Sequence, residues 1–144
     1  MPERHVLKIR RTFDATAEEV FEALRDPELL REWAAPDEHR TEAVEMDFRE
    51  GGSYRRRMRF PDGSVHLLRG EYLEIEPPRR LVYTYRWETI QEAPDTVVEI
   101  DLRERDGQTE LRLVHSGFEA GETADDHRGG WESCLDRLAK LLEG

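Results

Sequence analysis

The amino-acid sequence predicts an α+β fold in which an antiparallel sheet of six to seven strands packs against helices. Two patterns lead to this prediction. From about residue 41 to residue 118, apolar and polar side chains mostly alternate with the period of two that is typical of strands. Near the C-terminal end an apolar stripe recurs with a helical period, at Trp131, Cys134, Leu135, Leu138, Leu141 and Leu142. A half-buried sheet and an apolar helix stripe are both covered when they pack together.

The first part of the chain is predicted to form a strand followed by two short helices. Residues 5–13, HVLKIRRTF, alternate as a half-buried strand does. Thr16 and Glu19 have the spacing of a capping box, which indicates that a helix begins there. Asp26 and Pro27 then supply a new cap and a first-turn proline, so a second short helix is expected to follow.

The middle of the chain is predicted to form the remaining strands. The alternating segments are residues 41–48, 53–60, 65–76, 80–89, 96–104 and 109–118. Pro61-Asp62-Gly63 predicts a tight hairpin turn, because proline presets φ and glycine tolerates a positive φ. If the next hairpin pairs Glu104 with Thr109, one face contains Val98, Ile100, Leu102, Leu111, Leu113 and His115.

Composition narrows the classes of function. The 144 residues are expected to form a single domain, residues 1–144, and they carry a net charge of −11. This charge argues against binding to nucleic acid or to an anionic membrane surface, since both need a positive field. The single cysteine, Cys134, excludes an internal disulfide. No apolar run is long enough for a membrane span and no signal sequence is evident, so a cytoplasmic location is expected.

The motifs of common catalytic and cofactor sites are missing from the sequence. The five histidines form no helical metal-binding pair, and HExxH does not occur. There is also no GxSxG elbow, phosphate loop or dinucleotide fingerprint. We therefore predict no metal, no cofactor and no assigned catalytic residue.

The order of the segments resembles the helix-grip fold of the START and birch-pollen-allergen (SRPBCC) superfamily. In that fold a curved antiparallel sheet wraps around a long C-terminal helix. Within the superfamily the chain is most similar to the domain of the activator of heat-shock-protein-90 ATPase, in its small bacterial single-domain form. The likeness spans nearly the whole chain and rests on RTFDATAEEVFEAL, DPELLREW, FREGGSYRRRM, FPDGS, GEYLEIEPPRRLVYTYRW, TELRLVHSGF and HRGGWESCLDRLAKLLE.

The resemblance implies that the C-terminal helix covers an interior that can hold a ligand. Gly129 and Gly130 precede Trp131 in this helix, although each glycine costs roughly 1 kcal/mol relative to alanine. Either Gly130 permits a close approach of helix and sheet, or its missing side chain leaves room for a ligand. The candidate cavity residues are Trp33, Tyr54, Arg56, Met58, Arg69, Glu71, Tyr83, Tyr85, Trp87, His115, His127, Gly130 and Trp131.

Arg56 is the most unusual residue of the predicted inner face, because similar proteins more often carry an apolar or aromatic side chain there. A buried guanidinium is costly unless it is paired and hydrogen-bonded. With a tight turn, Arg69 and Glu71 would share its face, and Glu71 could pair with it. Alternatively, Arg56 reaches water at the sheet edge, or it recognises an anionic group of a ligand in an otherwise apolar pocket.

Three functions remain open from the sequence. The favoured one is binding of a small apolar, aromatic or amphipathic molecule, either neutral or anionic, in an internal cavity. The second is a cyclase-, aromatase- or hydrolase-type enzyme, with Glu71 or His115 for acid–base chemistry and Arg56 to hold an oxyanion. The third is a co-chaperone-like protein-interaction module, as the name of the similar family suggests. Homodimerisation is an option for small domains of this type, and the sequence contains no direct sign of it.

Overall fold

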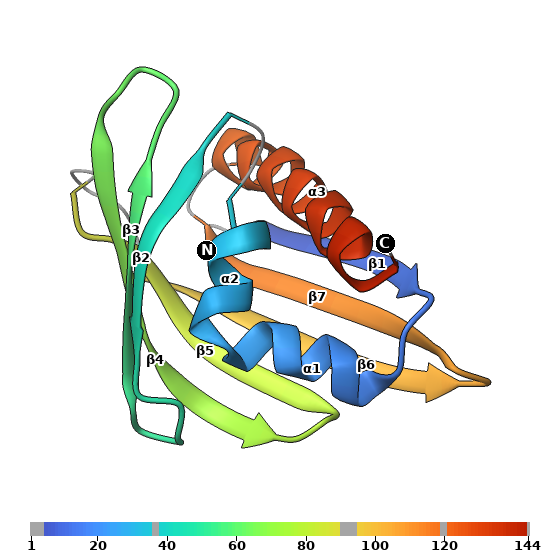
Figure 1. Ribbon diagram of the computed structural model, residues 1–144. Coiled ribbons are helices and arrows are strands. Elements are labelled where there is room, and N and C mark those ends of the chain that lie inside the picture. Colours follow the sequence, from blue (N-terminus) through green and yellow to red (C-terminus); the bar gives the residue numbers. More distant parts are fainter. Residues whose placement is uncertain (1–4, 36–37, 90–94, 119–120, 144) are drawn as a thin grey trace.

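A computed structural model describes residues 5–35, 38–89, 95–118 and 121–143 of the chain (Figure 1). Seven strands and three helices follow one another in this part. They are β1 (His5–Phe13), α1 (Ala17–Arg25), α2 (Pro27–Trp33), β2 (Arg40–Met46), β3 (Ser53–Arg59), β4 (Val65–Glu76), β5 (Arg80–Trp87), β6 (Thr96–Arg105), β7 (Gln108–Phe118) and α3 (Gly121–Glu143). The predicted order of elements is therefore confirmed.

The strands form one antiparallel sheet in the order β1-β7-β6-β5-β4-β3-β2. Figure 1 shows that the sheet is curved and that the three helices lie on the same side of it. The helix-grip α+β fold is confirmed, with seven strands. Glu104 pairs with Thr109 as predicted, so the apolar side chains of β6 and β7 face the helices together.

The two short helices begin where the capping signals predict. Thr16 and Glu19 form a reciprocal capping box at the start of α1. The carboxylate of Asp26 accepts the backbone N–H of Glu28 at 2.9 Å and caps α2, with Pro27 in the first turn. These bonds satisfy backbone donors that have no partner within a helix. None of the described helices is long and apolar enough to span a membrane.

The core fills the space between the concave face of the sheet and the helices. The buried face of α3 includes Trp131, Cys134, Leu135 and Leu138, as the apolar stripe predicts. The opposite face of the sheet is solvated and carries ion pairs. Arg80 of β5, for example, bonds Asp101 at 2.9 Å and Glu99 at 3.0 Å on the neighbouring strand β6. Apolar side chains on one face and charged side chains on the other are typical of an antiparallel sheet with one solvated face.

Candidate functional site

A cavity of about 660 Å³ lies on the concave side of the sheet, beneath α3. This volume falls in the range of small-molecule sites, about 300–1,000 Å³. Side chains from β3, β4, β5 and α3 line the cavity, together with the segment that follows α2. The lining residues are Ala34, His39, Arg56, Met58, Phe60, Leu68, Tyr85, Trp87, His127, Gly129, Gly130, Trp131, Ser133 and Cys134.

Arg56 supplies an uncompensated positive charge to this cavity. Its side chain is only 8 % exposed, and Nε has no hydrogen-bond partner in the described part of the chain. The lining contains no aspartate or glutamate among the described residues. The guanidinium carbon lies 5.0 Å from the centre of the Tyr54 ring, which provides a cation–π contact but no negative charge.

The surrounding tyrosines do not neutralise Arg56 at neutral pH. Burial works to lower the pKa of Arg56, yet this pKa stays above its ordinary value beside Tyr83 and Tyr54. Burial raises the pKa of Tyr54, Tyr83 and Tyr85, so their hydroxyl groups keep their protons. The cavity therefore holds a cation that is surrounded by neutral groups.

Gly70 allows the Tyr54 ring to lie beneath Arg56. The Tyr54 hydroxyl reaches over β4 and donates a hydrogen bond of 2.6 Å to the carbonyl oxygen of Thr84 on β5. A Cβ atom at residue 70 would lie 1.9 Å from that oxygen and 2.6 Å from the Tyr54 ring, so only glycine fits. The Thr84 hydroxyl accepts the backbone N–H of Glu71 at 2.8 Å. Side chains thus bridge β4 and β5 where the regular pairing of the two strands is interrupted.

His115 is buried behind the cavity and is fixed in one tautomer. Trp131 Nε1 donates to His115 Nδ1 at 3.0 Å, so the ring proton resides on Nε2. His115 Nε2 then donates to the Thr96 hydroxyl at 2.7 Å, which in turn donates to the carbonyl of Tyr85 at 2.8 Å. Burial, aided by the nearby charge of His127, lowers the pKa of His115 to about 3. His115 is therefore a neutral residue that orients Trp131.

The structure brings together about half of the predicted cavity residues. Those that line the cavity are Arg56, Met58, Tyr85, Trp87, His127, Gly130 and Trp131. Tyr54, Tyr83 and His115 are buried behind them. Trp33 packs away from the cavity, and its Nε1 donates to the carbonyl of Ala23 at 2.9 Å.

The predicted inward positions of Arg69 and Glu71 are wrong. The β3–β4 hairpin turns at Pro61-Asp62-Gly63 as predicted, with the Gly63 N–H bonded to the Phe60 carbonyl. The strand register differs from the one assumed, because the Phe60 N–H bonds the Ser64 carbonyl and Arg59 pairs with Val65. Arg56 consequently pairs with Leu68. Arg69 and Glu71 point to the opposite, solvated face, so the predicted ion pair between Arg56 and Glu71 does not exist. Glu71 is also too remote for the acid–base role considered for it.

The remaining lining residues were not predicted. They are Ala34, His39, Phe60, Leu68, Gly129, Ser133 and Cys134. Phe60 continues the alternation of Tyr54 and Met58, and that signal identifies it. Leu68 follows only from the correct register of β3 and β4. Ala34 and His39 lie outside the helices and strands, and no sequence period indicates their positions.

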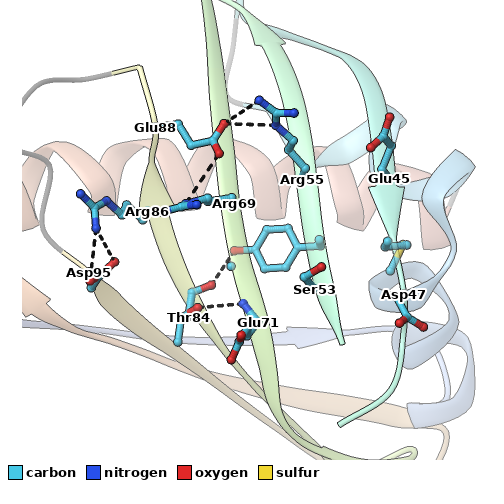
Figure 2. A pocket seen from close by; sticks show the side chains of 13 residues that line it. Glu45, Asp47, Ser53, Arg55, Arg69, Glu71, Thr84, Arg86, Glu88 and Asp95 are labelled. Atoms are coloured by element: carbon cyan, nitrogen blue, oxygen red, sulfur yellow. Dashed lines mark hydrogen bonds and ion pairs between the residues drawn. The ribbon is translucent and has the colours of Figure 1, made fainter. Parts of the chain in front are cut away.

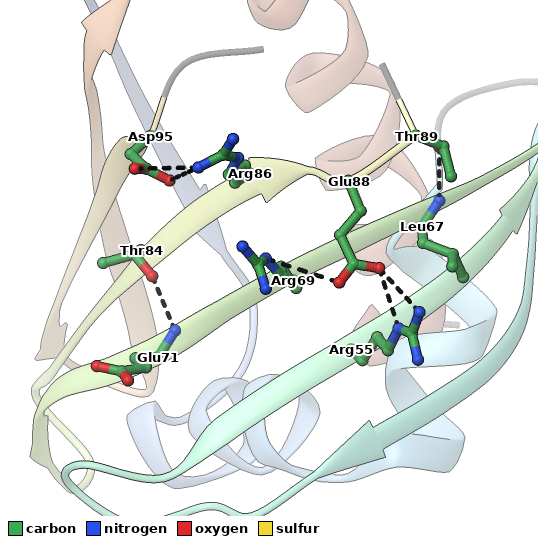
Figure 3. A network of polar contacts seen from close by, with 9 residues as sticks. All are labelled: Arg55, Leu67, Arg69, Glu71, Thr84, Arg86, Glu88, Thr89 and Asp95. Atoms are coloured by element: carbon green, nitrogen blue, oxygen red, sulfur yellow. Dashed lines mark hydrogen bonds and ion pairs between the residues drawn. The ribbon is translucent and has the colours of Figure 1, made fainter. Parts of the chain in front are cut away.

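A second pocket, of about 780 Å³, lies on the solvated face of the sheet (Figure 2). Arg55, Arg69 and Arg86 are direct neighbours on β3, β4 and β5. Figure 3 shows that acidic side chains offset this row of positive charges. Glu88 contacts Arg55 at 3.0 Å and Arg69 at 3.6 Å, and Asp95 contacts Arg86 at 3.4 Å. These arginines are paired and half exposed, in contrast to Arg56.

Comparisons with known proteins agree with this architecture. A protein from Chromobacterium violaceum has a similar structure, with 27 % identity and a TM-score of 0.87 over 96 % of this chain and 97 % of that one. An AHSA1 protein from Silicibacter pomeroyi has 24 % identity and a TM-score of 0.84 over 96 % and 98 % of the two chains. No curated protein matches the sequence. Residues 14–143 match the family model described as activator of Hsp90 ATPase homolog 1-like protein, and the chain therefore belongs to this family.

Proposed function

We propose that the protein binds a small, largely apolar or aromatic molecule that carries one anionic group, with the anion held by Arg56. The observation that supports this most directly is the buried guanidinium, which faces a cavity without an acidic partner. Carboxylate or phosphate oxygens would supply an anionic partner for the guanidinium in a charge-assisted hydrogen bond. Tyr85, Trp87 and Trp131 would contact the apolar part of the ligand.

The buried charge of Arg56 lowers the stability of the ligand-free protein, and this supports the same proposal. Desolvation of an ion without a partner costs several kcal/mol, and an apolar side chain would avoid that cost. Most buried positions of the inner face are occupied by apolar side chains, so the sheet does not require a charge here. A ligand anion would offset the desolvation cost when it binds.

Thermal-shift assays with ligands that differ only in charge test this proposal. We expect 2-naphthoate to raise the melting temperature, because a ligand that binds only the folded state stabilises it by mass action. The neutral 2-naphthamide should have a much smaller effect, since it cannot neutralise Arg56. Native mass spectrometry of the purified protein provides a second readout. If neither carboxylates nor co-purifying molecules are found to bind, the proposal fails and a protein-interaction role becomes the better explanation.

The glycine pair of α3 gives a further prediction. A Cβ atom at Gly130 would have no neighbour within 4 Å, and the same is true of Gly129, so neither glycine is needed for close helix packing. Gly130→Ala should therefore raise the free energy of unfolding by about 1 kcal/mol. Because Gly130 lines the cavity, the added methyl group should also weaken binding of 2-naphthoate about tenfold or more.

Chemical denaturation and a binding titration check the effect of Gly130→Ala. The smaller benzoate serves as a control ligand, and its affinity should change little. Gly129→Ala is the matched variant, because Gly129 is exposed whereas Gly130 is half-buried. It should give the same gain in stability with a smaller loss of affinity. A loss of stability in Gly130→Ala would instead favour the close-approach explanation.

A further inference from the structure

Cys134 lines the cavity that contains Arg56. It is the only cysteine of the chain, and its side chain is 7 % exposed. Cys134 belongs to α3, whereas Arg56 belongs to β3, so a nucleophile and a cation line one cavity from two separate elements. A lone buried cysteine is usually a small packing residue. The guanidinium of Arg56, which no described carboxylate of the lining neutralises, gives this cysteine a different setting.

Two tyrosines of β5 connect Arg56 with Cys134. Burial is the main reason that the pKa values of Tyr83 and Tyr85 are raised. Beyond burial, both hydroxyl groups respond to the same two neighbours, because Arg56 lowers and Cys134 raises their pKa values. Arg56 and Cys134 both line the cavity.

We propose that Cys134 is a covalent capture site for anionic electrophiles, in particular for carboxylates with an electrophilic carbon close to the carboxylate group. This inference rests on the proposed function, because Arg56 would draw the anion and hold it beside the thiol. The ligand class that fits is an α,β-unsaturated carboxylate with an apolar or aromatic body. The cation would also favour the thiolate, which is the reactive form of cysteine.

The capture reaction is a simple addition. The Cys134 thiolate attacks an unsaturated carbon of the ligand, and a carbon–sulfur bond forms while the carbon–carbon π bond breaks. The electron pair of that π bond moves to the adjacent carbon, which then takes up a proton from water. The proton lost from the thiol returns to solvent, so the sum is a thioether with no leaving group and no oxidant.

Alkylation with two reagents that differ in charge tests the inference. Iodoacetate is an anion and iodoacetamide is neutral, and with both the thiolate displaces iodide to form a thioether. The chain has one cysteine, so the intact mass reports Cys134 alone, and Cys134→Ser should remain unlabelled. The net charge of −11 repels iodoacetate in general. A preference for iodoacetate would therefore have to come from a local positive charge.

The measured quantity is the labelling rate with iodoacetate divided by the labelling rate with iodoacetamide. We expect this ratio to be about tenfold higher for the folded protein than for the urea-unfolded chain. Arg56→Met should remove this preference for iodoacetate, and it should slow iodoacetamide less than iodoacetate, because the neutral reagent senses only the smaller thiolate fraction. Arg69→Met is the matched control, because it deletes the same charge from the solvated face of the adjacent strand, where Arg69 is 54 % exposed. It should leave both labelling rates unchanged. Excess 2-naphthoate should protect the wild-type protein from iodoacetate.

Covalent capture is tested directly with 3-benzoylacrylate, an unsaturated aromatic carboxylate. Wild-type protein should gain one adduct mass, and Arg56→Met should gain it far more slowly. The inference would be overturned if the preference for iodoacetate over iodoacetamide were the same in the folded and the unfolded chain. It would also be overturned if the thiol of the folded protein reacted with neither reagent. If 2-naphthoate still stabilises the protein in that case, the proposed binding function stands and only the capture site falls.

Discussion

Arg56→Met is expected to abolish carboxylate binding and to make the free protein more stable. Loss of a buried charge–charge contact costs about 2–5 kcal/mol, so the affinity for 2-naphthoate should fall by about thirtyfold or more. The free energy of unfolding should rise by about 1–3 kcal/mol, because methionine fills much of the same space without a desolvated charge. Calorimetric titration and urea denaturation measure the two effects.

The opposite signs of these two effects distinguish a ligand-binding arginine from a structural one. Arg69→Met removes the same formal charge from the solvated face, where surface ion pairs contribute about 0–1 kcal/mol, and it should change neither quantity much. Arg56→Lys should retain part of the affinity, because it keeps the charge but loses the planar fork of donors. If Arg56→Met instead unfolds the protein, Arg56 stabilises the fold and the binding proposal loses its main support.

Stability is expected to decrease as the pH falls below 6.5, and His115 should account for much of the decrease. The folded state keeps this ring neutral, with a pKa of about 3, whereas the unfolded chain has the ordinary value of 6.5. Between these values the unfolded state binds more protons, so acid favours unfolding. The stabilisation is complete above pH 6.5 and is lost progressively towards pH 3. Over the range from pH 6.5 to pH 4.5 the loss amounts to about 2–3 kcal/mol.

His115→Gln separates this contribution from that of the carboxylates. The amide can accept the Trp131 N–H and donate to Thr96, so the hydrogen bonds can persist without a titrating ring. Urea denaturation from pH 7 to pH 4.5 should give a clearly flatter profile for this variant. Below pH 4.5 both proteins should lose stability, because ion pairing with arginines lowers the pKa of Glu42 and Glu110 in the folded state. Parallel profiles above pH 4.5 would contradict the neutral state of His115.

Local signals in the sequence were sufficient to predict the individual strands and helices. The period of two identified every strand, and the capping residues Thr16 and Asp26 located the starts of α1 and α2. The apolar stripe of α3 identified the helix face that packs on the sheet. These signals depend on residues that are close in sequence, and the family resemblance supplied the arrangement of the elements in space.

The cavity was harder to predict, because it depends on strand register and on contacts between distant residues. A register change of one residue moves a side chain to the other face of a sheet, and the pairing set by the turn after β3 does this to Arg69 and Glu71. The tautomer of His115 depends on Trp131, sixteen positions away in the sequence. Neither periodicity nor composition contains that information.

The placement of the three tryptophans gives the protein an intrinsic optical reporter. Trp87 and Trp131 line the cavity, whereas Trp33 is packed against α1 with its indole N–H bonded to a backbone carbonyl. Indole fluorescence is sensitive to the immediate surroundings of the ring. A molecule that enters the cavity will therefore alter the emission of two tryptophans directly, while the third supplies a nearly constant background.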